Sequence, residues 1–137
     1  MASNREAYVD TSAFIAFFDR SDAHHELFKQ LFANPPRLIT TALVLGEGHA
    51  WFLRRYNRQR ALQFLGLVRA LSPLTTQPMG RDEYEGAVAI LRKFADQDLT
   101  LADTLGLYTM QTCKTDACWS TDFHLGLTGV PLAIHGT

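Results

Sequence analysis

The sequence has little net charge, few cysteines and no long apolar run. Its 137 residues carry a formal net charge of −1, which excludes a surface covered with basic residues but allows a local basic patch. No apolar stretch is long enough to span a bilayer, and residues 1–6 lack the pattern of a signal peptide. We therefore expect a cytoplasmic protein.

Cys113 and Cys118 are the only cysteines. They are compatible with a disulfide, half a metal site or two buried thiols. The third interpretation is favoured, because a cytoplasm keeps thiols reduced and no second cysteine pair completes a metal site. The sequence also lacks a Walker loop, a glycine-rich dinucleotide fingerprint and a Gly-x-Ser-x-Gly motif, and its histidines show no spacing typical of zinc sites.

Hydrophobic residues make up 47% of the chain and charged residues 20%, as in an ordinary globular protein. The length suits one domain, which we place over residues 1–137. Short apolar runs alternate with segments of helical periodicity. This alternation predicts an α/β fold with a mostly parallel central sheet and helices on both faces.

The predicted elements follow from periodicity and from turn residues. Strands are expected at residues 8–9, 37–40, 117–121 and 132–134, with a weak strand inside 72–79. Helices are expected at residues 12–18, 42–56, 59–70, 82–94 and 101–113, and Asn57 is expected to close the second of these. One more helix is expected to begin at Ser21-Asp22, with Asp22 as its N-cap. Residues predicted to face inward from these helices are Leu27, Leu31, Leu62, Leu65, Val68, Val88 and Leu91, with Phe28 and Phe32 as further candidates.

Asp10 stands directly after the first apolar run. Thr11 and Ser12 follow it, and then a helical pattern begins, so the segment has the form strand, turn, helix. Ligand sites in open α/β sheets lie beyond the carboxyl ends of the strands. Asp10 is therefore either the N-cap of the next helix or the first member of a site.

Glu47 lies on an apolar helical face. It shares that face with Leu43, Ala50 and Trp51, where an unpaired carboxylate is costly. Such a carboxylate needs a cation, a partner or a raised pKa, unless it simply reaches past the apolar face to water. The glycines on either side of Glu47 weaken the helix, and they allow a close approach by another backbone or by a substrate.

Two further acids also stand near the ends of elements. Asp103 forms a capping-box pattern with Thr100, and this geometry also directs its carboxylate out of the helix N-terminus. Asp122 follows the strand predicted at 117–121, where a turn or cap role is the simpler interpretation. Carboxylates gathered at one sheet edge repel each other and raise some of their pKa values. A divalent cation such as Mg²⁺ or Mn²⁺ relieves this repulsion, because hard cations prefer oxygen ligands.

The one basic cluster follows the helix that carries Glu47. It consists of Arg54, Arg55, Arg58 and Arg60. Such a run is commonly a solvated helix end, and a track for a phosphate backbone is the functional alternative.

With these residues in hand, the sequence resembles the PIN-domain ribonucleases, most closely the toxin subunits of VapBC-type toxin–antitoxin pairs. Residues 9–13 resemble the family's opening motif, Glu47 its helical glutamate, residues 98–103 its third motif and residues 120–123 its fourth. His124-Leu125 departs from the pattern, where a further polar or acidic residue is expected before the aromatic. Gly48 beside Glu47 is a second departure.

The resemblance implies a PIN-like three-layer fold, a Mg²⁺ or Mn²⁺ cofactor, endonuclease attack on RNA and a homodimer. It also implies a VapB-like antitoxin that binds across the acidic cleft. On this basis the catalytic and metal-binding residues are Asp10, Glu47, Asp103 and Asp122. Ser12 and Thr121 are expected to hold a water or to orient a carboxylate, and the four arginines to bind RNA.

Two alternatives come from other functional classes. The first is a PIN fold that binds RNA or a protein without cutting, and the four intact acids argue against it. The second is a phosphatase or phospho-acceptor domain with a strand-end aspartate. Such hydrolases usually carry a second aspartate two residues after the first, where this sequence has Ser12.

Overall fold

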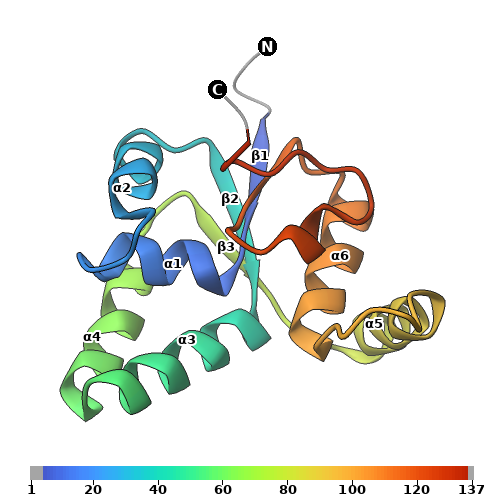
Figure 1. Ribbon diagram of the computed structural model, residues 1–137, viewed down its shortest axis with the longest axis horizontal. Helices are drawn as coiled ribbons and strands as arrows, with labels where there is room; N and C mark the ends of the chain where they lie inside the picture. The colour runs from blue at the N-terminus through green and yellow to red at the C-terminus, as the bar shows by residue number, and fades with distance from the viewer. Residues whose placement is uncertain (1–4, 136–137) are drawn as a thin grey trace.

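The computed structural model describes residues 5–135, which form a three-layer α/β fold (Figure 1). The central sheet has four strands, all parallel, in the order β3-β2-β1-β4. The strands are β1 Glu6–Val9, β2 Arg37–Thr41, β3 Leu74–Gln77 and β4 Ala117–Trp119. The helices are α1 Thr11–Phe18, α2 His25–Ala33, α3 Ala42–Arg55, α4 Arg58–Arg69, α5 Arg81–Lys93 and α6 Leu101–Cys113, with a short 3₁₀ helix, η2, at Phe123–Gly126. The predicted fold class is confirmed.

The strand order explains how the helices divide between the two faces. From β1 to β3 the chain moves one way across the sheet, and α1, α2, α3 and α4 lie on one side of it in Figure 1. The chain then returns past β1 to β4, and α5 and α6 lie on the other side. Right-handed crossovers require this change of face when the direction reverses. The reversal falls between β1 and β4, where open α/β sheets commonly bind ligands.

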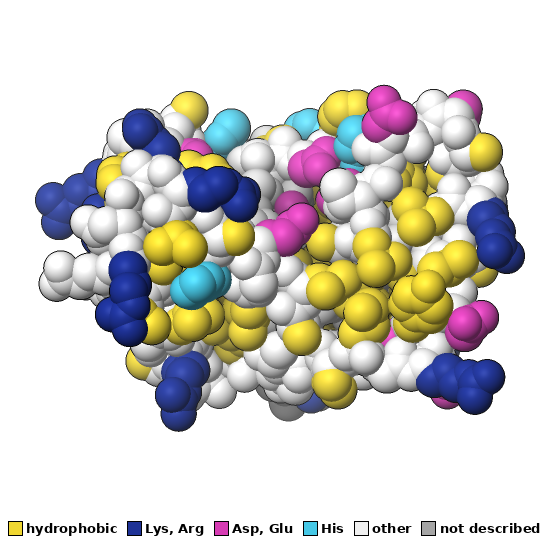
Figure 2. All heavy atoms as spheres, turned by 90° about the horizontal axis from the view of Figure 1, so that it is seen from below, with side chains coloured by type: hydrophobic (Ala, Val, Ile, Leu, Met, Phe, Trp, Pro, Cys, Tyr) yellow, Lys and Arg dark blue, Asp and Glu magenta, His cyan; other side chains and the backbone are white. Residues whose placement is uncertain are grey.

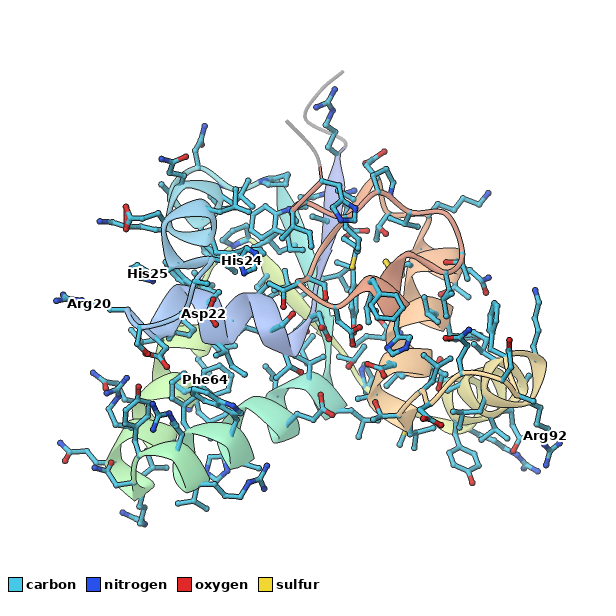
Figure 3. All side chains as sticks on the ribbon, in the orientation of Figure 1. Arg20, Asp22, His24, His25, Phe64 and Arg92 are labelled. Carbon is cyan, nitrogen blue, oxygen red and sulfur yellow. The ribbon has the colours of Figure 1, made fainter. Side chains whose placement is uncertain are left out.

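An aromatic cluster fills the space between the sheet and α1–α4. Phe64 of α4, labelled in Figure 3, is 1% exposed, and its ring lies 5.2 Å from that of Phe52 and 6.0 Å from that of Phe14. The ring also lies against the backbone of Gly48. Burial of such rings is the main favourable term that holds α1, α3 and α4 together.

These ring–glycine contacts account for an error in the predicted helix faces. Leu62 is 46% exposed, whereas α4 buries Ala61, Phe64 and, as predicted, Val68. Insertion of the Phe64 ring against Gly48 fixes the rotation of α4. A similar contact between Tyr108 of α6 and Gly86 of α5 accompanies the burial of Ala87 and Ile90, so that Val88 and Leu91 are only half-buried. In α2 the further candidates Phe28 and Phe32 are the buried residues, while Leu27 and Leu31 are half-buried.

Several predicted boundaries were also wrong. Asp22 does not cap α2, because its carboxylate accepts a hydrogen bond from the backbone N–H of His24 and the helix begins at His25. Asn57 does not close α3; it caps α4 by accepting from the N–H of Arg60. The predicted last strand is reduced to one isolated bridge between Cys118 and Leu132. The strand predicted at 117–121 ends at Trp119, before the site residues begin.

Cys118 and Cys113 are both free thiols. Cys118 is buried, as predicted, whereas Cys113 is only half-buried. Within residues 5–135 no helix combines the length and the apolar character needed to cross a membrane.

The two glycines that flank Glu47 should respond oppositely to alanine. A Cβ at Gly46 meets no atom within 4 Å, so Gly46→Ala should stabilise α3 by about 0.5–1 kcal/mol through helix propensity. A Cβ at Gly48 collides with the buried ring of Phe64, so Gly48→Ala should cost about 1–3 kcal/mol through overpacking. Urea denaturation of both variants measures these changes, and equal effects would contradict the packing described.

Candidate active site

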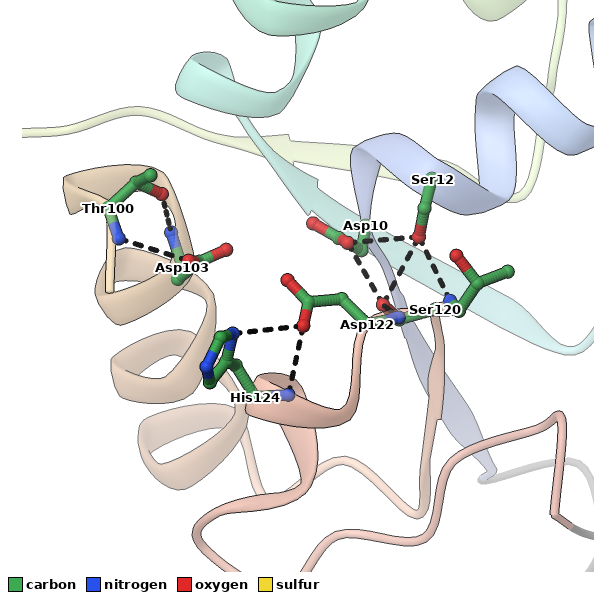
Figure 4. A network of polar contacts seen from close by, with 8 residues as sticks. Asp10, Ser12, Thr100, Asp103, Ser120, Asp122 and His124 are labelled. Atoms are coloured by element: carbon green, nitrogen blue, oxygen red, sulfur yellow. Dashed lines mark hydrogen bonds and ion pairs between the residues drawn. The ribbon is translucent and has the colours of Figure 1, made fainter. Parts of the chain in front are cut away.

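The carboxyl ends of β1 and β4 bring Asp10 beside Ser120. The backbone N–H of Asp10 donates to the carbonyl of Trp119 at 2.9 Å, which continues the pairing of the two strands by one residue. The Asp10 Oδ2 atom then accepts hydrogen bonds from Ser120 Oγ at 2.9 Å and Ser12 Oγ at 3.1 Å (Figure 4). Asp10 holds the N-cap position of α1, but its side chain makes no capping hydrogen bond. Helix capping therefore does not explain this carboxylate.

Burial makes the Asp10 carboxyl group unusual. It is 6% exposed, and loss of solvation raises its pKa to about 6. The hydrogen bonds from Ser120 and Ser12 oppose this rise, and the negative charge of Asp103 adds to it. Near neutral pH the site thus holds an anion that burial disfavours, and a nearby positive charge would stabilise it.

A second group of ligand atoms lies at the N-terminus of α6 and the start of η2. Asp103 Oδ2 accepts from the N–H of Thr100 at 3.0 Å, and Thr100 Oγ1 accepts from the N–H of Asp103 at 3.0 Å, which completes the predicted capping box. Asp122 Oδ1 accepts from the N–H of His124 at 3.0 Å and lies 3.1 Å from His124 Nδ1. One ligand atom each from Asp103, Asp122 and His124 fall within 4.8 Å of one another.

This donor set suits a divalent cation. Carboxylate oxygens and an imidazole nitrogen are ordinary ligands for Mn²⁺ and related metals, and the carboxylates alone suit Mg²⁺. In the described part of the chain, neither lysine nor arginine forms an ion pair with Asp10, Asp103 or Asp122. No lysine or arginine of residues 5–135 therefore offsets the charge of these acids, and His124 is the one side chain with a basic group beside them. The capping box occupies Asp103 Oδ2, but the carboxylate is directed toward Asp122 (Figure 4).

Glu47 lies apart from this group. It is exposed, and its Oε1 accepts a hydrogen bond from Thr11 Oγ1 at 2.7 Å. The predicted face of α3 exists, but it lines an open cleft of about 720 Å³ and does not enter the core. The core face of α3 is instead formed by Val44, Gly48 and Phe52. Glu47 therefore does not bear the burial cost that the sequence suggested.

The residues that support the acids were predicted in part. Ser12 does orient a carboxylate, since its hydroxyl donates to Asp10, and it also accepts from the N–H of Thr121 at 3.0 Å. Thr121 takes part in this network through its backbone. Ser120, which is fully buried, holds Asp10 and accepts from the N–H of Asp122 at 2.9 Å.

Sequence reasoning missed Ser120, Thr11 and His124. The register offered one signal, because Ser120 directly follows the strand that pairs with the strand before Asp10. His124 was overlooked because the histidines were compared only with one another. Its ligand partners are carboxylates from two different elements.

The arginine cluster divides between two surfaces. Arg54 lines the cleft that Glu47 lines, whereas Arg60 lines a separate cavity with Asp19 and lies 4.3 Å from the ring centre of Tyr56. Figure 2 views the carboxyl end of the sheet, with acidic side chains near the centre and basic ones gathered toward α3 and α4. Arg92 lies on α5, far from the basic side chains of α3 and α4 (Figure 3).

The raised pKa of Asp10 predicts how stability depends on pH. Between its ordinary pKa of 3.8 and about 6, the folded protein holds a proton that the unfolded chain has lost. The free energy of unfolding of metal-free protein should therefore fall as pH rises through this window, by up to about 3 kcal/mol from this group. Asp10→Asn should lack this pH-dependent fall in the free energy of unfolding, because asparagine does not titrate. Its advantage over the wild type in chemical denaturation should grow from pH 4 to pH 7, and a constant difference would refute the raised pKa.

Comparison with known proteins places the chain in a family. The model of the PIN domain family matches residues 7–123. No match was found among curated protein sequences.

Solved structures support the same fold. Mycobacterium tuberculosis VapC20, described as a sarcin–ricin loop cleaving toxin, superimposes with a TM-score of 0.82 at 22% identity, over 90% of this chain and 95% of that one. A toxin–antitoxin complex from Klebsiella pneumoniae gives 0.64 at 22% identity, over 92% and 94% of the two chains. VapBC2 from Rickettsia felis, bound to a DNA fragment from its promoter, gives 0.65 at 11% identity, over 93% and 96%. The family match spans most of the sequence, and the chain therefore belongs to the PIN domain family.

Proposed function

We propose that this protein is an endoribonuclease that depends on Mg²⁺ or Mn²⁺, and that it is the toxin of a toxin–antitoxin pair. The observation that carries the proposal is the convergence of Asp103, Asp122 and His124 near the buried Asp10, with no lysine or arginine of residues 5–135 paired to the acids. Membership of the PIN domain family supports nuclease chemistry. The description of the M. tuberculosis neighbour as a toxin that cleaves the sarcin–ricin loop agrees with this assignment.

The acids have different roles in this proposal. Asp103 and Asp122 approach each other across the site and would hold the cation directly, while Asp10 contributes its negative charge from the buried side. Ser12 and Ser120 hold the Asp10 carboxylate in place through its Oδ2 atom. Glu47 accepts a hydrogen bond from Thr11, and it would contact the cation from the side of the cleft through a bridging water. When bound, a divalent cation supplies a water of lowered pKa and stabilises charge on a phosphoryl group.

His124 adds a nitrogen donor to a site that the sequence indicated was purely acidic. One of its ring nitrogens lies within 4.8 Å of ligand atoms of Asp103 and Asp122. Imidazole favours transition metals over Mg²⁺, because nitrogen is a softer donor than carboxylate oxygen. We therefore propose that Mn²⁺ binds more tightly than Mg²⁺.

The proposed partners are RNA and a small antitoxin. The neighbours from K. pneumoniae and R. felis are described as a toxin–antitoxin complex and as VapBC2, which supports an antitoxin for this chain too. The surface around Asp103 and Asp122 is the one that such a protein would have to cover to block cleavage. The homodimer stays a prediction. The alternative of a PIN fold that binds RNA or a protein without cutting also stays open, and it differs from the proposed nuclease because it predicts no metal-dependent cleavage.

Metal binding should be measurable as stabilisation of the folded protein. Mg²⁺ and Mn²⁺ should each raise the melting temperature of the wild type, and Asp122→Asn and Asp10→Asn should reduce the rise because each removes a negative charge. His124→Asn should reduce the response to Mn²⁺ more than the response to Mg²⁺. Cleavage of a mixed RNA pool should require the metal and should be abolished in Asp122→Asn.

The matched control is His24→Asn, since His24 lies on the exposed loop before α2 (Figure 3). It should keep the full response to both metals. Robust RNA cleavage by the wild type in excess EDTA would refute the role of the metal. If Asp10→Asn keeps full cleavage activity and the full metal-induced rise in melting temperature, Asp10 has no part in the site.

The arginine cluster should supply salt-dependent affinity for RNA, because binding to phosphates releases counterions. Replacement of Arg54, Arg55 and Arg58 by glutamine should weaken binding and reduce the slope of log Kd against log salt by up to about 0.7 for each phosphate that is no longer neutralised. Arg92→Gln on α5 is the matched control (Figure 3). Filter binding in EDTA at several salt concentrations measures both, and an unchanged slope in the triple variant would make the cluster an ordinary solvated helix end.

A further inference from the structure

The cleft beside the acids has a feature that metal chemistry does not require. One wall is the exposed face of α3, formed by Leu43, Gly46, Glu47, Ala50, Trp51 and Arg54. The opposite wall is the start of α6, with Thr100, Leu101 and Ala102. Most of this lining is apolar, although the cleft is open to solvent. Such a surface has a cost in water unless something covers it.

The cleft is continuous with the proposed catalytic site. Thr11 follows Asp10, Thr100 bonds the backbone of Asp103, and Glu47 lines the cleft itself. A group in the cleft therefore lies beside any phosphate held at the acids. The volume of about 720 Å³ falls within the range of ordinary small-molecule sites.

Trp51 and Arg54 define the kind of group that fits. Trp51 is half-buried, and its ring packs edge-on against Phe52 with 5.0 Å between the ring centres, so that it is held in place. Arg54 is one turn further along the same face and supplies the positive charge among the described residues of the lining. A flat aromatic surface next to a cation suits a planar base joined to a phosphate.

From this arrangement we infer that the cleft is a nucleobase subsite, in which one base of single-stranded RNA stacks on Trp51 while Arg54 contacts a neighbouring phosphate. The inference rests on the proposed function for its choice of RNA as ligand. Gly46 leaves room for the base, because it lines the cleft and a Cβ at this position meets no atom within 4 Å. A larger side chain at this position would fill the space that the base would occupy.

The two tryptophans make a direct measurement practicable. Trp119 is 4% exposed and packs against Phe32, whereas Trp51 lines the cleft. Quenching of intrinsic fluorescence by an unlabelled RNA therefore reports on Trp51. The titration is done in EDTA, so that the RNA stays intact and the result does not depend on cleavage.

RNA oligonucleotides of about ten nucleotides, roughly the length that one single-strand binding surface covers, should quench the wild type. Trp51→Phe should bind with similar affinity but without quenching, since phenylalanine still offers a stacking surface. Trp51→Ala should bind about tenfold more weakly, as expected for the loss of one stacked base. Gly46→Leu should weaken binding to a similar degree while leaving Trp51 in place, which guards against a folding defect in Trp51→Ala. Tyr84→Ala, at an exposed aromatic residue of α5, is the control and should bind like the wild type.

A set of oligonucleotides with one abasic nucleotide at each position tests the base itself. At one position or more the missing base should weaken binding to the wild type but not to Trp51→Ala. If Trp51→Ala and Gly46→Leu bind intact and abasic RNA as the wild type does, the inference is wrong, even if the protein cleaves RNA. Base-dependent binding without any metal-dependent cleavage would keep the subsite and refute the nuclease instead.

Discussion

The site depends on a buried carboxylate held between two paired strands. The N–H of Asp10 bonds the carbonyl of Trp119, so that the side chain of Asp10 must lie beside Ser120. Two hydroxyl groups then bind one oxygen of the carboxylate and leave the other directed away from them (Figure 4). Because the carboxylate is removed from water, its charge is expensive unless a cation is near. Burial therefore positions Asp10 and also makes its negative charge costly, which supports the proposed cation.

The reversal of strand order explains why the other acids meet there. The chain enters α1 after β1 on one face of the sheet, and it reaches β4 from α6 on the other face. The space between these two paths is bordered by the N-terminus of α6 and the turn after β4. Asp103 and Asp122 occupy these positions, and the backbone N–H of Asp122 bonds Ser120, the residue that also holds Asp10. One serine therefore links the two halves of the site.

Much of the fold, and the placement of the acids at the ends of elements, could be predicted because both depend on patterns within a few residues, such as the capping box of Asp103. Contacts between elements could not. His124 was missed because its ligand partners come from two elements that only the fold brings together. Helix α3 has two apolar faces, and periodicity cannot tell which one is buried, since both satisfy the same spacing. The packing of Phe64 against Gly48 decides this, and it leaves the face of Glu47 in the cleft.

The charge pattern explains how a chain with a net charge of −1 can suit a polyanion. Acids lie at the centre of the carboxyl end of the sheet, while basic side chains gather over α3 and α4 (Figure 2). A nucleic acid that followed the basic surface would reach the acids through the cleft of α3, where Arg54 lies one turn from Trp51. Without metal, repulsion disfavours a phosphate placed directly at the acids, because charges of one sign then face each other. The divalent cation proposed above would offset this repulsion, and the acids would then help to hold a phosphate at the site.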